Sequence, residues 1–119
     1  MEYKTTVTKL GDTYQDMFDE GLVIVFNDNA PPELADLSAL HTPAKLPGKV
    51  KSGDEVVLGD KRFTVTAVGS EANHTLEKMG HCTFIFTGED QAELDGNIIL
   101  KGDGMPKLKP GSPFEIYFK

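Results

Sequence analysis

Three histidines and one cysteine are the residues of this 119-residue chain whose side chains most readily carry covalent chemistry. His41, His74 and His81 are spread along the sequence, and Cys82 is the single cysteine. A zinc site needs several such ligands at close spacing, so this arrangement does not predict a metal site. Cys82 directly follows His81, and neighbours on a strand point to opposite faces, which argues against a catalytic Cys-His pair.

Two other short motifs lack a residue that their chemistry needs. Asp28 lies between two asparagines, as in a calcium loop, but the position that would need a glutamate is Ala39. Ser70 lies in the segment VGSEA, which lacks the second glycine of a nucleophile elbow. No glycine-rich phosphate loop with a lysine occurs. The sequence therefore predicts no metal and no cofactor, and the single histidines remain as candidates.

The three histidines differ in their expected surroundings. His74 should lie on a helix, away from its apolar stripe, and be exposed. His81 begins a strand just after a glycine, where it could line a cleft or bond a backbone carbonyl, and both options stay open. His41 ends an apolar segment before Thr42 and Pro43, at the mouth of a loop, where an imidazole can be both reachable and oriented. A surface histidine that merely ends a segment is the plain alternative.

The stretch 62–87 is the most regular part of the chain and positions two of these histidines. Residues 62–68 alternate between apolar and polar side chains, as in a half-buried strand. A short helix is expected next, capped by Ser70, ended by Gly80, and with an apolar stripe of Ala72, Leu76 and Met79. Residues 81–87 alternate again, with Cys82 on the apolar side, which predicts a buried, inert thiol.

The rest of the chain supplies further short elements. Strands are expected at 2–10, 22–26, 55–58, 97–101 and 113–118, and short helices at 13–20 and, running into a strand, 33–40. The apolar run 22–26 fits a central strand covered on both faces. Seven or eight short strands predict an all-β fold, a mainly antiparallel barrel or sandwich with two or three short helices. The length fits a single domain over residues 1–119.

Two turns have similar sequences and form a weak internal repeat. Lys51-Ser52-Gly53-Asp54 precedes EVVL, and Lys109-Pro110-Gly111-Ser112 precedes PFEIYF. Both are basic-x-Gly-polar turns that lead into a strand. Because such turns are common, chance is favoured here over pseudo-symmetry.

The composition limits the partners and the compartment. The net charge is −7, from 12 basic and 19 acidic residues, which argues against nucleic acid and fits a basic protein partner, or solubility alone. No apolar run reaches the ~20 residues needed to cross a membrane, and the N-terminus lacks the apolar core of a signal peptide. One cysteine permits no internal disulfide, as in a reducing cytosol, so a cytoplasmic protein is expected.

A set of motifs spread over nearly the whole chain is shared with a known family. It comprises FTVTAVGS at 63–70, then Asn73, Leu76, Met79-Gly80-His81, Thr83, Phe86, Gly88 and Asp95-Gly96, with Thr5–Thr8, LVIVF, Ala30-Pro31 and Pro110-Gly111-Ser112 outside this core. With this set the chain resembles the sorbitol (glucitol)-specific enzyme IIA component of the bacterial phosphotransferase system. The segment TAVGS…N..L..MGH.T is its most specific part.

The resemblance implies a cytosolic, mainly β protein that accepts a phosphoryl group from the phosphocarrier protein HPr on one histidine. It would pass this group to a cysteine on the IIB part of the sorbitol transporter. The family's histidine falls on His41, and its Gly-His-x-Thr motif falls on residues 80–83. Some members carry a second histidine and a glycine shortly after the first, where this chain has Thr42-Pro43-Ala44. We therefore expect His41 as the nucleophile, and His81, Thr42 or backbone amides as groups that stabilise the phosphate.

The family resemblance also implies a docking surface beside His41. Leu40, Pro43 and Leu46 should form an exposed apolar rim on which HPr and then the IIB component dock, while the IIC component completes the transporter. A homo-oligomer is possible, and no cofactor or metal is required. The main alternative is a non-catalytic β-barrel that binds a ligand or regulates a partner. A small metal-dependent hydrolase is the third interpretation.

Overall fold

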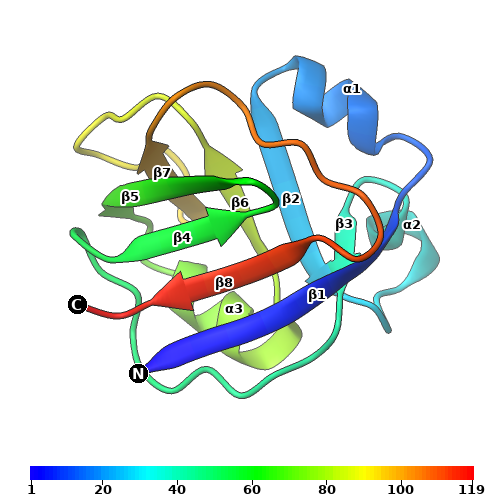
Figure 1. Ribbon diagram of the computed structural model, residues 1–119, viewed down its shortest axis with the longest axis horizontal. Helices are drawn as coiled ribbons and strands as arrows, with labels where there is room; N and C mark the ends of the chain where they lie inside the picture. Colours follow the sequence, from blue (N-terminus) through cyan, green and yellow to red (C-terminus); the bar gives the residue numbers. More distant parts are fainter.

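The computed structural model describes residues 1–119 and contains eight strands that close into one barrel (Figure 1). The order around the barrel is β1-β3-β2-β6-β7-β5-β4-β8, and β8 pairs with β1. The strands are β1 (Glu2–Leu10), β2 (Leu22–Asn27), β3 (Ala39–His41), β4 (Glu55–Leu58), β5 (Lys61–Val68), β6 (Cys82–Ile85), β7 (Asn97–Lys101) and β8 (Pro113–Tyr117). The expected all-β fold is confirmed, as a barrel and not a sandwich.

Three short helices lie outside the barrel wall (Figure 1). Helix α1 (Tyr14–Asp19) packs on β2, and α3 (Ala72–Met79) contacts β6 and β2. Helix α2 (Pro32–Ala35) is a single turn that begins at Pro32. Cover of β2 is incomplete, since Ile24 on its outer face is only half-buried. None of the three helices is long and apolar enough to cross a membrane.

Most neighbouring strands run antiparallel, as expected, but two pairs are parallel. These are β2 with β3 and β6 with β7. Parallel pairs were not expected because the helices are too short to cross over a sheet. This reasoning was incomplete: the connections 28–38 and 86–96 return the chain along the barrel with one helical turn or none, close to the length of about a dozen residues that a parallel connection needs.

The second half of the chain repeats the architecture of the first. Apart from α2, the order β1-α1-β2-β3-β4 recurs as β5-α3-β6-β7-β8. Strand β1 pairs antiparallel with β3 as β5 does with β7, and the parallel pair β2–β3 has its counterpart in β6–β7. Strand β2 pairs with β6, and β4 with β8, each antiparallel, as equivalent strands beside a two-fold axis do. The barrel therefore has internal pseudo-two-fold symmetry.

The two similar turns noted in the sequence are equivalent parts of this repeat. The Gly53 N–H donates to Val65 O at 2.8 Å, and the Gly111 N–H donates to Val7 O at 2.7 Å. Both glycines have positive φ, 99° and 96°. The interpretation of this sequence similarity as chance was therefore wrong, because the turns match in hydrogen bonding and not only in residue type.

Strand register shows which residues correspond in the two halves. Strand β1 pairs with β3 at Val7 and His41 and then slips at an irregularity. Strand β5 pairs with β7 at Val65 and Leu100 and slips at the matching place. Because Val7 and Val65 are equivalent, His41 occupies the position that Leu100 holds in the second half.

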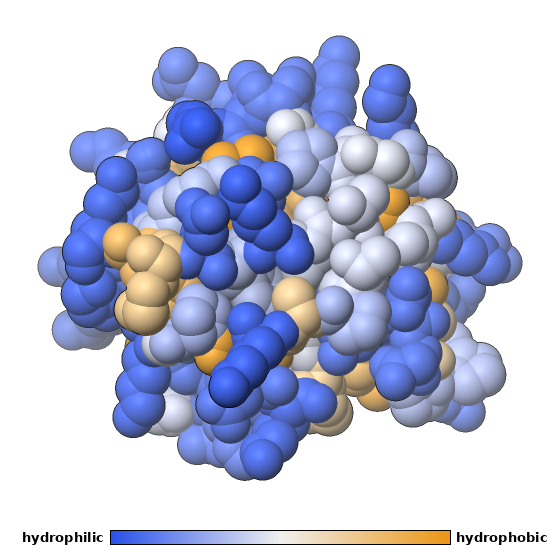
Figure 2. All heavy atoms as spheres, turned by 60° about the horizontal axis from the view of Figure 1, so that its bottom comes forward, coloured by the Kyte–Doolittle hydropathy of each residue, from blue (hydrophilic) through white to orange (hydrophobic).

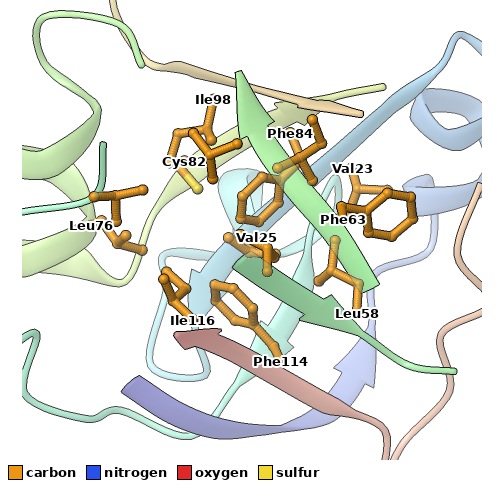
Figure 3. Close-up of a cluster of buried hydrophobic side chains, with 14 of the residues drawn as sticks. Val23, Val25, Leu58, Phe63, Leu76, Cys82, Phe84, Ile98, Phe114 and Ile116 are labelled. Carbon is orange, nitrogen blue, oxygen red and sulfur yellow. The ribbon is translucent and has the colours of Figure 1, made fainter. Parts of the chain in front are cut away.

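The barrel interior is filled by side chains from both halves (Figure 3). Phe63 and Val65 of β5 and Cys82 and Phe84 of β6 are all buried, which confirms the alternation expected for these strands. The Cys82 sulfur points into this cluster (Figure 3). The expected burial of Cys82 is confirmed, and this burial raises the pKa of its thiol.

Candidate functional site

His41 is the last residue of β3, and its side chain is fully buried, with 0% exposure. Its ring lies edge-on to Phe114, with centroids 5.0 Å apart, and edge-on to Tyr3 at 6.5 Å. These contacts hold the imidazole at the inner side of the barrel wall. The sequence analysis expected a histidine that is both reachable and oriented. The structure orients the His41 ring but covers it, because β3 turns this side chain inward.

Both ring nitrogens of His41 face backbone carbonyl oxygens. Nδ1 lies 2.9 Å from Thr42 O, and Nε2 lies 2.8 Å from Gly80 O. A carbonyl oxygen can only accept, and a neutral imidazole has only one N–H to donate. One of the two contacts therefore sets a nitrogen lone pair against an oxygen lone pair in the neutral ring.

Protonation of the ring would satisfy both carbonyls but is opposed by burial. Burial lowers the pKa of His41 below its ordinary value, and this outweighs the carbonyls of Thr42 and Gly80 and the charge of Asp28, which act in the opposite direction. The ring is therefore held neutral in a place that would suit a cation. A neutral imidazole is the form that can act as a nucleophile.

Gly80 and His81 form the corner that covers His41. Gly80 ends α3 in the left-handed conformation, with φ of 62°. The His81 Nδ1–H donates to Val25 O at 3.1 Å, and its ring stacks on Phe26 at 4.6 Å. Of the two options for His81, the bond to a backbone carbonyl is thus the one observed. Its ring is only half-buried, and no group of the protein engages its Nε2.

Thr42 lies beside the covered ring and is half-exposed. Its hydroxyl oxygen accepts the Thr6 N–H at 3.1 Å, which extends the pairing of β1 and β3 by one residue. The hydroxyl hydrogen has no partner in the protein, so Thr42 keeps one free donor beside His41.

Asn27 belongs to this site and was missed by the sequence analysis, which ended the expected strand at residue 26. It ends β2 and lies opposite His41 in the parallel pair. Its Oδ1 is buried without a hydrogen-bond partner. A methyl carbon on Gly80 would overlap this oxygen and lie 2.8 Å from His41 Cε1, so the three residues meet at one point. A signal was present: the inward positions Val23 and Val25 are followed by a polar residue.

The same place in the second half of the barrel is apolar. Strands β6 and β7 pair at Ile85 and Ile99, and the next step of this register sets Phe86 opposite Leu100. The pair Asn27 and His41 thus replaces a pair of large apolar side chains. Since the fold accommodates the apolar pair, the polar pair is not required for the barrel to form.

The surface around the site is less apolar than expected. Leu40 and Leu46 are buried, at 7% and 8% exposure, and only Pro43 of the expected rim is exposed. The expectation of a rim from these three residues was therefore wrong for the two leucines. Met79, directly before Gly80, is 39% exposed. Figure 2 shows one face of the molecule, on which apolar atoms appear as small patches among hydrophilic residues.

The remaining candidates lie apart from this site. His74 is exposed on α3, as expected, and lines a surface hollow with Asn73, Glu77 and the loop around Lys49. Ser70 borders the same hollow. The structure contains no group of three or more His, Cys, Asp and Glu side chains that could hold a metal ion.

Comparisons with known proteins agree on one family. The family model described as the PTS system glucitol/sorbitol-specific IIA component matches residues 2–115. The glucitol/sorbitol-specific EIIA components of Shigella flexneri and Escherichia coli (strain K12) are each 34% identical over 110 residues, which cover 92% of this chain and 89% of theirs.

A solved structure shows the same fold. The crystal structure of a PTS system IIA component from Enterococcus faecalis V583 superposes with a TM-score of 0.85 at 26% identity, and covers 98% of this chain and 100% of that one. The family model and the two relatives extend over nearly the full barrel, including both halves of the repeat and every residue of the site. The chain therefore belongs to the family of glucitol/sorbitol-specific IIA components of the phosphotransferase system.

Proposed function

We propose that this protein is a cytoplasmic phosphoryl carrier, which accepts a phosphoryl group from phospho-HPr on His41 and passes it to a cysteine of the IIB component of a sorbitol transporter. The family supports a relay role in sugar uptake. The main structural support is the imidazole of His41, buried and oriented where the other half of the barrel has Leu100. A buried polar ring that the fold does not need is typical of a functional group.

Nε2 is the nitrogen we assign as the nucleophile. Nδ1 is held by the carbonyl of Thr42, the next residue of the chain, so Nδ1–H can donate there while the Nε2 lone pair stays free. In the transfer, the bond from phosphorus to HPr breaks as the N–P bond to His41 forms, and the leaving group of HPr takes a proton from solvent. In the onward step the cysteine, deprotonated to the thiolate, forms the S–P bond as the N–P bond breaks, and His41 leaves as the neutral imidazole that keeps its Nδ1–H.

The cover over Nε2 has to move for this reaction. Gly80 O lies 2.8 Å from Nε2, where the incoming phosphorus must be. Rotation of the Gly80–His81 peptide would remove this oxygen and bring an N–H or the half-exposed His81 ring towards the phosphate. The rotation breaks the bond from the His81 N–H to Thr75 O at 3.2 Å, and the glycine allows it because its backbone has no Cβ to restrict it. Docking of HPr supplies the interaction energy that favours the open form.

His81 and Thr42 are the groups we assign to the phosphoryl oxygens. The free hydroxyl hydrogen of Thr42 and, when protonated, the Nε2–H of His81 are donors beside the ring. Phosphoryl transfer depends mainly on position and on stabilisation of charge on the equatorial oxygens, so two such donors are appropriate. No metal ion enters this step.

A second assignment of the acceptor is supported by the exposure of His81. Its Nδ1 is fixed by Val25 O, its Nε2 has no partner, and its ring is half-exposed. This is also the arrangement of a phosphate-accepting imidazole. His41 remains the main proposal because it lies among Asn27, Thr42 and Gly80, whereas His81 stacks on an apolar ring.

Phosphoryl labelling distinguishes these assignments. The purified chain is incubated with phosphoenolpyruvate, enzyme I and HPr, and the acid-labile phosphate on the chain is measured for wild type, His41→Gln, His81→Gln and His74→Gln. We expect no label on His41→Gln, slower labelling of His81→Gln, and wild-type labelling of the exposed His74→Gln control.

Other outcomes would contradict the proposal in distinct ways. Normal labelling of His41→Gln together with loss in His81→Gln would assign the acceptor to His81. A wild-type chain without label, in a mixture where HPr itself is labelled, would instead favour the non-catalytic barrel that binds or regulates a partner.

A further inference from the structure

We infer that Asn27 is a further catalytic residue of this site, whose carboxamide donates a hydrogen bond to the phosphoryl group on His41. This inference rests on the proposed function of His41. Asn27 takes no part in the transporter family's shared motifs quoted above, and its placement is visible only in the folded barrel.

The side chain of Asn27 is not used by the fold. It forms no hydrogen bond within the protein, and its Oδ1 is buried without a partner. A buried polar atom in this state destabilises the folded protein. Nearly all buried polar atoms in native proteins have partners, so this exception needs a reason. A partner that is present only in another state of the protein would be such a reason.

The pseudo-two-fold repeat supplies an internal comparison. The position equivalent to Asn27 is Phe86, which packs edge-on against Phe63 with centroids 5.1 Å apart. An apolar residue therefore serves the structure at this position. The polar residue occurs only in the half that also has a histidine in place of Leu100, so the two polar exchanges occur together, on facing residues of one parallel pair.

The geometry directs the carboxamide to the reacting atoms. In a parallel pair, facing residues have their side chains on the same side of the sheet, so Asn27 and His41 point the same way. Both also reach the space above the Gly80 Cα, where the Asn27 Oδ1 and the His41 Cε1 meet. Cε1 lies next to Nε2 in the imidazole ring. A phosphoryl group on Nε2 would thus carry its oxygens to the place that the Asn27 carboxamide now occupies.

The chemical type of the group suits a carrier. The carboxamide Nδ2 has two N–H donors and stays neutral. It can stabilise the charge that spreads over the phosphoryl oxygens during transfer. A lysine or arginine in its place would form an ion pair with the product and hold it more tightly. A carrier must pass the group on, so a neutral donor stabilises the transfer without trapping the phosphate.

Four variants test this assignment. Asn27→Val restores the apolar alternation of β2 and removes both the donor and the orphaned oxygen. Asn27→Asp keeps the shape but offers only acceptors. Asn29→Asp is the matched charge control, since Asn29 is exposed two residues further on. Phe86→Val places the same residue, valine, at the equivalent apolar position of the second half. Each is measured for its rate of labelling by phospho-HPr and for its thermal unfolding.

We expect both Asn27 variants to accept phosphate about 100-fold more slowly than wild type, as when a donor to developing charge is removed. Asn27→Val should melt at the same temperature as wild type or higher, so activity and stability change in opposite directions. A purely structural role would lower both. Asn29→Asp and Phe86→Val should label within about twofold of wild type, because neither touches the phosphoryl group.

Two results would overturn the inference, and they are distinguishable. If wild type is labelled on His41 and both Asn27 variants label at the wild-type rate, Asn27 does not contact the phosphoryl group. If wild type carries no label on His41, the proposed function fails first, and this inference fails with it. The phosphorus NMR signal of the labelled protein gives a second measure: it should shift in Asn27→Val and stay unchanged in Asn29→Asp.

Discussion

Gly80 is the residue at which α3 ends against His41 and Asn27, and Gly80→Ala is expected to disable the site. Gly80 has φ of 62°, and a Cβ there would overlap Asn27 and lie 2.8 Å from His41 Cε1. The equivalent residue of the first half is Gly21, which ends the segment of α1 just before β2. It also has positive φ, 86°, but a Cβ on it would meet no atom within 4 Å. Gly21→Ala is therefore a matched control for backbone strain.

The difference between the two variants measures the contact with the site. Alanine in the left-handed region costs about 1–2 kcal/mol, and roughly 0.4–1 kcal/mol of this is offset because alanine restricts the unfolded chain. Gly21→Ala should therefore lose about 1 kcal/mol of the free energy of unfolding. Gly80→Ala has the same strain and in addition overfills a packed space, for about 1–3 kcal/mol more. For a chain of this size 1 kcal/mol corresponds to roughly 4 °C in Tm, so we expect a fall of about 4 °C against about 8–16 °C.

Thermal unfolding and phosphoryl labelling together provide the assay. Gly21→Ala should be labelled at the wild-type rate, whereas Gly80→Ala should be labelled slowly even well below its Tm, because the new methyl group displaces the ring or the carboxamide. If both variants lose the same stability and both are labelled normally, then Gly80 does not pack against His41 and Asn27, and the geometry of the site is refuted.

Two further predictions concern groups outside the site. The buried carboxylate of Asp54 accepts the N–H groups of Lys119 at 2.8 Å and Lys51 at 2.9 Å, and its counterpart in the second turn is Ser112. Asp54→Ser should lose roughly 2 kcal/mol at neutral pH. Burial raises the pKa of Asp54, but these N–H groups and the Lys51 ammonium lower it more, so its folded pKa lies below the unfolded one. The stabilisation is therefore present above the ordinary carboxyl pKa and is lost as the pH falls through the folded pKa. Melting curves of wild type and Asp54→Ser should converge in acid, and a constant gap would exclude the charge as the cause. Cys82 should react with an aromatic disulfide reagent only as fast as the protein unfolds, since burial raises the pKa of its thiol; rapid reaction of the native protein would contradict its burial.

Local patterns predicted most of the elements of this barrel correctly. The alternation in 62–68 and 81–87 identified β5 and β6, because one face of each strand packs into a single interior. Gly80 was identified as a helix terminator from its residue type alone, since few other residues adopt positive φ. The parallel pairs and the two-fold repeat were not predicted. They depend on pairing between distant segments, and the two halves share a pattern of hydrogen bonds without sharing many residues.

The candidate site was predicted in part. The three histidines were identified by chemical type, and His41 and His81 were singled out by their likeness to family motifs. The exposure of His41 and of Leu40 and Leu46 was predicted wrongly, because the chain before a proline-containing loop was assumed to lie at the surface. Here β3 sets Leu40 and His41 between β1 and β2, and the loop after it packs Leu46 against the core, which only the closure of the barrel determines.

The sequence by itself determined the class of fold, the buried cysteine and the candidate histidines, because each depends on residue type or on spacing within one element. The tertiary structure decided which of these residues meet. It brings Asn27, His41 and Gly80 together from three separate elements and covers the His41 ring with a backbone carbonyl. It also shows that the polar pair Asn27 and His41 takes the place that an apolar pair, Phe86 and Leu100, holds in the other half. Such relations follow from strand order and register around a closed barrel, which short-range patterns along the chain do not contain.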